Sequence, residues 1–183
     1  MGLYDYVNRT KTFISGDWTG DRNIIDKLKE WNNNEKFGLS FVDVHEVTQS
    51  CDSSLSCSIK RSLRQRLKIS KTFVLIVGEN TKTLTKGSCR YCNLYLPGSA
   101  NCLNRGNIDN RSFIQFECEM ALKDYIDNEL KKIVVIYNGR LTPDKSLCPD
   151  IIKGYGTHIG SDRIGEDGKR YWNYSVIKEA ICG

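Results

Sequence analysis

Two segments of this chain are apolar at consecutive positions, and they constrain its fold more than any other feature. "KTFVLIVGEN" occupies residues 71–80 and "KKIVVIYNG" occupies residues 131–139. A strand that is apolar without a break is covered on both faces, which occurs almost only in parallel sheets flanked by helices. The two segments therefore predict an α/β fold with a parallel sheet at its centre.

The remaining segments alternate between strand and helix patterns. Further strands are predicted at 11–17 and 39–44, and helices at 21–31, 53–67 and 174–181. Asp21 is placed to cap the first helix, and Ser112 with Gln115 forms a capping box that starts another. This order predicts a flavodoxin-like, doubly wound parallel sheet, whose functional residues are expected at the carboxyl ends of the strands.

The 183 residues are expected to form a single domain, 1–183, because their number suits one hydrophobic core. Residues 81–111 interrupt the alternation and are too many for an ordinary connection, so we interpret them as an insertion before the helix that starts at Ser112.

Composition excludes several classes of function. The net charge of +5 is mild and has no long basic run with it, which argues against a nucleic-acid partner. The longest apolar run is only strand-length, and the N-terminus lacks the apolar stretch of a signal peptide. We therefore expect a cytoplasmic protein with reduced thiols that does not bind membranes.

Glu117 occupies an unusual position on the helix that starts at Ser112. On a wheel of 100° per residue it falls in the gap between two apolar arcs, whereas Glu119 falls on the polar face. Apolar walls exclude water and strengthen electrostatic interactions, so such a carboxylate suits a site where positive charge is stabilised. The alternative is a glutamate favoured by the helix dipole or paired with Arg111.

The ordered set of these segments resembles TIR and TIR-like domains, in particular the antiphage TIR proteins of bacterial Thoeris systems. "KTFISGDW" resembles the first strand and its phosphate-proximal loop, and residues 41–81 resemble the second strand, the variable BB loop, a helix and the central strand. "SFIQFECEMAL" resembles the aromatic-x-x-x-Glu start of the family's catalytic helix. Phe113 stands where Trp is usual, Glu117 falls on the catalytic position, and the 81–111 insertion is a further departure.

The resemblance implies an enzyme that cleaves the bond between nicotinamide and ribose in NAD+, with NAD+ as substrate and no separate cofactor. Nicotinamide in NAD+ leaves without protonation, so the chemistry needs a carboxylate that stabilises an oxocarbenium-like ribose, the role expected of Glu117. The ADP-ribose-type product, linear or cyclic, would activate a separate effector protein. The BB loop, residues 44–54, would serve in self-association. The alternative is a non-catalytic TIR module for protein–protein interaction.

Other residues are candidates for substrate binding. Ser15, Gly16, Asp17 and Trp18 follow the first strand and offer close backbone approach, a ribose partner and a stacking surface. The remaining candidates are Phe113 and the residues that end the second strand, Asp43, His45 and Glu46. Each of these loop residues has an ordinary structural alternative, as a capping, solvated or packing residue.

Eight cysteines are many for a cytoplasmic chain. Three lie in the insertion and one follows it on the helix, so a structural zinc at Cys89, Cys92, Cys102 and Cys118 is one interpretation, beside free thiols and disulfides. The other four are interpreted as buried small hydrophobes. Two other proteins of related fold are argued against. The central strand ends "VGEN" without the phosphoacceptor Asp that a receiver domain needs, and no G-x-G-x-x-G follows the first strand, as it would in a Rossmann dehydrogenase.

Overall fold

A four-stranded parallel sheet forms the centre of the computed structural model, which describes residues 11–39, 41, 55–98, 101–103 and 108–183. The sheet has the order β1-β2-β5-β6, and its strands are Lys11–Ser15, Ser70–Val77, Lys132–Tyr137 and Thr157–Gly160. A flavodoxin-like sheet has the strand order 2-1-3-4-5, of which the described strands supply 1-3-4-5. The α/β class predicted from the sequence is confirmed.

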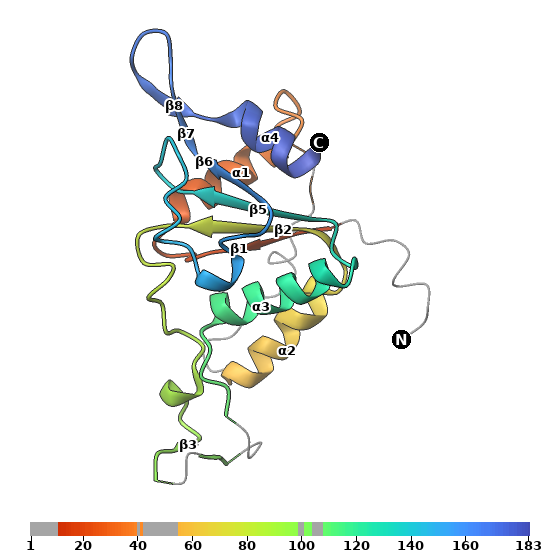
Figure 1. Cartoon of the computed structure of the whole chain (residues 1–183), viewed down its shortest axis with the longest axis vertical. Helices are drawn as coiled ribbons and strands as arrows, with labels where there is room; N and C mark the ends of the chain where they lie inside the picture. Colours follow the sequence, from red (N-terminus) through yellow and green to blue (C-terminus); the bar gives the residue numbers. More distant parts are fainter. Residues whose placement is uncertain (1–10, 40, 42–54, 99–100, 104–107) are drawn as a thin grey trace.

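Helices cover both faces of this sheet (Figure 1). One face carries α1 (Arg22–Asn33) and α4 (Tyr174–Cys182), and the other carries α2 (Ser56–Leu67) and α3 (Phe113–Ile126). Successive side chains of a strand point to opposite faces, so each strand supplies both cores. Phe13 of β1 packs on the α2–α3 side, for example, and its neighbour Ile14 packs on the α1–α4 side. Coverage of both faces explains why the strands are apolar at consecutive positions.

The start of α1 corrects one expectation, because Asp21 does not cap the helix with its side chain. The carboxyl group is 3% exposed, and its Oδ1 accepts a hydrogen bond from Nδ2 of Asn138 at 2.9 Å. It lies directly on Gly78, where a Cβ atom would come within 2.0 Å of Oδ1. The aspartate thus joins the β1–α1 loop to the end of β5 across the end of β2.

The capping box at the start of α3 is present as predicted. The hydroxyl of Ser112 accepts from the Gln115 N–H at 3.1 Å, and the Gln115 side chain accepts from the Ser112 N–H at 2.9 Å. The reciprocal pair satisfies two of the N–H groups that a helix start leaves without partners. It fixes the register of the helix that carries Glu117.

The insertion, 81–111, extends away from the sheet as an arm (Figure 1). It contains a short 3₁₀ helix, η2 (Cys89–Tyr91), and a small antiparallel hairpin of β3 (Tyr95–Leu96) and β4 (Asn101–Cys102). Among the described residues of this arm, the exposed large apolar side chains are Tyr91, Leu96 and Leu103.

Several elements in the last third of the chain were not predicted from the sequence. They are the edge strand β6, the 3₁₀ helix η3 (Asp150–Ile152), and a hairpin of β7 (Asp162–Ile164) and β8 (Arg170–Trp172). Each is four residues or shorter, so none develops the apolar run that identifies β2 and β5.

The expected strand at 39–44 lies largely outside the described residues. Leu39 and Phe41 are described, and both are buried in the core on the α1–α4 side, where the N–H of Phe41 donates to Oδ1 of Asn32 at 2.7 Å. The expected BB loop, 44–54, also lies outside them. Within the described ranges, no helix has the length and apolar character needed to cross a membrane.

Candidate functional site

Glu117 lies at the carboxyl end of the sheet, in contact with β1. Its side chain projects from the second turn of α3, and its Oε2 accepts a hydrogen bond from the hydroxyl of Ser15, the last residue of β1. Both residues are buried, with Ser15 0% and Glu117 5% exposed. The wheel position between two apolar arcs therefore corresponds to a carboxyl group inserted between α3 and the end of a strand.

Burial dominates the electrostatics of this carboxyl group. Removal from water raises the pKa of Glu117 from its ordinary 4.5 to about 8, although the hydrogen bond from Ser15 and the positive charge of Arg66 act in the opposite direction. Glu117 is therefore largely protonated at neutral pH in this state of the protein. A cation placed beside it would favour the ionised form.

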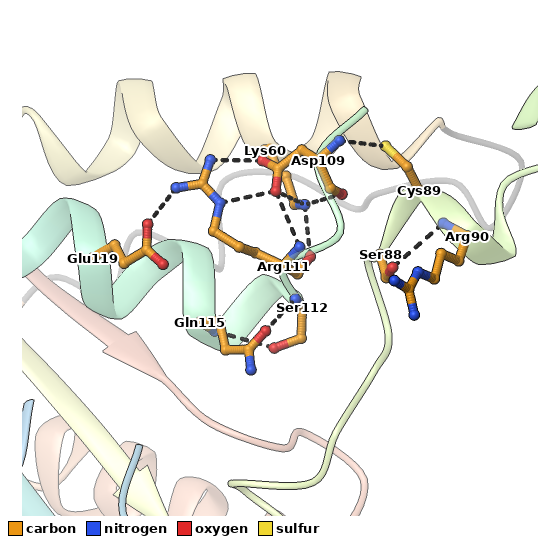
Figure 2. Close-up of polar contacts among 9 residues, drawn as sticks. All are labelled: Lys60, Ser88, Cys89, Arg90, Asp109, Arg111, Ser112, Gln115 and Glu119. Carbon is orange, nitrogen blue, oxygen red and sulfur yellow. Dashed lines mark hydrogen bonds and ion pairs between the residues drawn. The ribbon is translucent and has the colours of Figure 1, made fainter. Parts of the chain in front are cut away.

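The rival carboxylate, Glu119, has a different environment (Figure 2). Its Oε2 accepts from Nη1 of Arg111 at 2.5 Å, and its side chain is 35% exposed. Arg111 was the alternative ion-pair partner considered for Glu117, but its guanidinium binds Glu119 and Asp109. Glu119 is thus part of an ion-pair network rather than a freely solvated residue, and no contact of Glu117 with Arg111 is present in the described structure.

The same network fastens the base of the insertion between α2 and α3 (Figure 2). Lys60 of α2 is 4% exposed, and its ammonium donates to the carbonyl oxygens of Asp109 at 3.2 Å and Arg111 at 2.7 Å. Burial opposes ionisation of Asp109, but hydrogen bonds from Arg111 outweigh it and lower its pKa to about 2. The N–H of Asp109 also donates to Sγ of Cys89 at 3.3 Å.

Phe113, one of the residues predicted to bind substrate, packs at the start of α3. Its N–H donates to the carbonyl of Lys86 at 2.8 Å, and its ring lies on Gly87, whose φ is +99°. A Cβ atom at Gly87 would come within 2.5 Å of the ring, so only glycine allows this contact. Phe113 is partly buried against the α2–α3 core, on the same side of the sheet as Glu117.

The β1–α1 loop divides between the two faces of the sheet. Gly16 packs against Ile76, and a Cβ atom at Gly16 would lie only 3.0 Å from the Cβ of Ile76. Asp17 accepts from the N–H of Thr19 at 3.1 Å, which is an ordinary loop contact. Trp18 packs on the α1–α4 side, with Nζ of Lys29 5.0 Å from its ring centroid. The structure therefore brings Ser15 to Glu117 but directs Trp18 to the opposite face.

Three predicted substrate-binding residues, Asp43, His45 and Glu46, lie outside the described residues. The cysteines proposed for zinc are described and are free thiols: Cys89, Cys102 and Cys118 are buried, and Cys92 is partly buried. Among the described residues, no three His, Cys, Asp or Glu side chains are grouped so as to hold a metal ion. The geometry gives the zinc interpretation no support.

A polar cluster at the same edge of the sheet was not predicted from the sequence. Asn138 directly follows β5, and its amide exchanges hydrogen bonds with the amide of Asn23 at 2.9 and 3.2 Å while it also donates to Asp21. Burial raises the pKa of Asp21, and its Oδ2 is a buried atom without a hydrogen-bond partner among the described residues. An Asn immediately after an apolar strand was the available signal.

Residues 13–86 match the family described as "Thoeris protein ThsB, TIR-like domain". This segment, which is less than half of the chain, is similar to a TIR-like domain. The resemblance inferred from the sequence is confirmed over this segment, which runs from β1 to the loop after β2. The match ends before α3, so it does not extend to Glu117. No curated protein matches the chain in sequence.

Proposed function

We propose that this TIR-like protein is an enzyme of antiphage defence that cleaves NAD+ between nicotinamide and ribose. The products are nicotinamide and an ADP-ribose-type nucleotide, linear when water attacks the ribose and cyclic when a group of the same molecule does. That nucleotide would act as a signal for a separate effector protein. The match of residues 13–86 to the Thoeris ThsB family supports the role in antiphage defence, and the buried Ser15–Glu117 pair supports the cleavage of NAD+.

The observation that carries the proposal is the position of Glu117. Its carboxyl group lies at the carboxyl end of β1, where ligands of doubly wound folds bind, and its hydrogen bond to Ser15 fixes its orientation. The apolar side chains around it, on α3 and the sheet, keep the local dielectric low. An ionised carboxylate there stabilises developing positive charge on a ribose more strongly than it would in water.

The raised pKa is compatible with this role because the substrate carries a positive charge. The nicotinamide ring of NAD+ is cationic, and its charge passes to the ribose as the bond to nitrogen breaks. A cation beside Glu117 lowers the pKa of the carboxyl group and favours the ionised form. Since Glu117 is only 5% exposed, contact with ribose requires a local rearrangement that uncovers it.

Product analysis tests the proposal directly. Purified protein is incubated with NAD+, and nicotinamide and nucleotide products are separated by chromatography. Glu117→Gln keeps the shape and the Ser15 contact but removes the charge, so nicotinamide release should fall by about 10²–10³. Glu119→Gln, on the same helix, is the matched control and should retain most of the activity because it breaks only a partly exposed ion pair.

The pH dependence distinguishes an essential anion from a structural residue. If ionised Glu117 is the active form, kcat/KM of the wild type should rise with pH and level off above pH 8, since kcat/KM reports the pKa of the free enzyme. An active enzyme whose kcat/KM is flat from pH 6 to 9 would exclude this role.

The second candidate function is a non-catalytic interaction module. The exposed apolar side chains Tyr91, Leu96 and Leu103 on the arm favour it, because such residues are common in contacts between proteins. If the wild-type protein releases no nicotinamide at any protein concentration, the module is the better description.

A further inference from the structure

A polar cavity lies at the carboxyl end of β5, apart from the Ser15–Glu117 pair. Its volume is about 560 Å³, within the range of small-molecule sites. Residues 139–145, which follow β5, form most of its lining, and Arg170 of β8 completes it. In the sheet order, β2 separates β5 from β1, so this cavity and Glu117 occupy different parts of the same edge.

Hydrogen bonds to the neighbouring elements fix the walls of the cavity. The Gly139 N–H donates to the hydroxyl of Ser161 at 2.9 Å, and the carbonyl of Arg140 accepts from the Asp162 N–H at 3.0 Å. Gly160 brings the end of β6 so close to the loop that a Cβ atom there would lie 2.4 Å from the Arg140 carbonyl oxygen. These contacts hold the lining loop against the end of β6 and the residues that follow it.

Three cationic side chains line this cavity: Arg140, Lys145 and Arg170. Arg170 donates from Nε to Asp162 at 2.7 Å and from Nη2 to the carbonyl of Gly139 at 2.6 Å. Lys145 donates to the carbonyl of Lys153 at 3.0 Å. A guanidinium has five N–H donors and an ammonium has three, so each side chain is held in position with donors to spare.

One carboxylate belongs to the lining, and two carboxylates outside it form ion pairs with the lining arginines. Asp144 also lines the cavity, but it accepts from the Ser146 N–H at 3.1 Å and from its hydroxyl at 2.6 Å, and these bonds lower its pKa. Glu79 binds Arg140, and Asp162 binds Arg170. The lining has three positive charges and one negative charge, and two of the positive charges are paired with Glu79 and Asp162 outside it.

We propose that this cavity binds the diphosphate group of a nucleotide. The remaining N–H donors of two arginines and a lysine around this open polar cavity suit the many acceptor oxygens of a diphosphate, because guanidinium groups bind phosphate oxygens in pairs. The lining shares no residue with the Ser15–Glu117 pair, so binding of a diphosphate here does not depend on the proposed cleavage of NAD+. The diphosphate could belong to the substrate or to a separate regulatory nucleotide.

Isothermal titration calorimetry tests this site without any turnover. Inorganic pyrophosphate and ADP are titrated into the full-length protein at low salt, and each should bind saturably. In Arg140→Gln with Lys145→Gln, affinity should fall by about tenfold or more, because charge-assisted hydrogen bonds are lost. The matched control, Arg163→Gln with Lys169→Gln, removes the same charge from exposed positions of the β7–β8 hairpin outside the lining, and it should bind as the wild type does.

Control measurements show whether pyrophosphate and ADP bind in this cavity or elsewhere on the protein. Far-UV circular dichroism and thermal melting verify the fold of both double variants, which alter only side chains at the surface. Absence of saturable binding to the wild type, or equal loss in both double variants, overturns the proposal.

Glu117→Gln should keep its affinity for pyrophosphate whether or not NAD+ is cleaved. Tighter binding of ADP than of pyrophosphate indicates a nucleotide, and an increase of KM for NAD+ in Arg140→Gln with Lys145→Gln indicates that the diphosphate is the substrate's own.

Discussion

Replacement of Glu117 by glutamine should make the protein more stable at neutral and alkaline pH. The carboxyl group is 5% exposed, and burial raises its pKa from 4.5 to about 8. Between these two pH values the folded protein retains a proton that the unfolded chain releases. The free energy of unfolding therefore decreases as pH rises through this window, and the titration of Glu117 causes this decrease.

The size of the effect follows from the shift. A group that binds one proton more in the folded state changes the free energy of unfolding by about 1.4 kcal/mol per pH unit. Over the window from 4.5 to about 8, the total approaches about 5 kcal/mol, as an upper value. Glutamine has the same shape, accepts the Ser15 hydrogen bond and does not ionise, so the variant avoids this loss.

Urea denaturation at pH 5, 6, 7 and 8, at constant ionic strength, measures the difference. Asp21, whose pKa is also raised by burial, and His158, whose pKa burial lowers, titrate in both proteins, so their contributions cancel when wild type and variant are compared. The variant's advantage should increase steadily with pH between 5 and 7. Parallel pH profiles for the two proteins would refute the claim that a protonated carboxyl group is buried against Ser15.

Three further results are expected. Specific activity should increase with protein concentration if self-association completes the site, as the family resemblance implies; a rate strictly proportional to enzyme would indicate a self-contained site. Gly87→Ala should destabilise the fold by about 1–3 kcal/mol in urea denaturation, because it strains a positive φ and meets the ring of Phe113; an unchanged stability would show that the ring moves freely. Cys89→Ser with Cys92→Ser should reduce activity through disorder of the arm, and full activity of this variant, with no metal by elemental analysis, would remove zinc from consideration.

The sequence predicted those features that depend on long apolar patterns. β2 and β5 are apolar at almost every position because helices cover both faces of the sheet, and α3 begins at its capping box because two side chains and two N–H groups satisfy each other locally. The burial of Glu117 also followed from the helix wheel, because a side chain between two apolar arcs has no route to water.

Contacts between distant segments could not be predicted in the same way. The bond between Ser15 and Glu117 joins residues 102 positions apart, and no local pattern encodes it. Asp21 has the residue type and position of an N-cap. Its carboxyl group instead accepts a hydrogen bond from Asn138 and packs against Gly78, which has no side chain. The edge strand β6 has only four residues, too few to show an alternation of apolar and polar residues. It is therefore identified by its pairing with β5 and not by its sequence.

The charged base of the arm has a consequence for how such a chain can change over time. Lys60 binds the carbonyl groups of Asp109 and Arg111 in the segment that leads into α3, and Arg111 binds Glu119 on that helix. Because the entropy of closing a loop grows only slowly with its length, residues can be added or deleted beyond η2 at small thermodynamic cost. Such changes leave the first turn of α3 fastened to α2. The arm can therefore diversify rapidly while the helix that carries Glu117 stays in register.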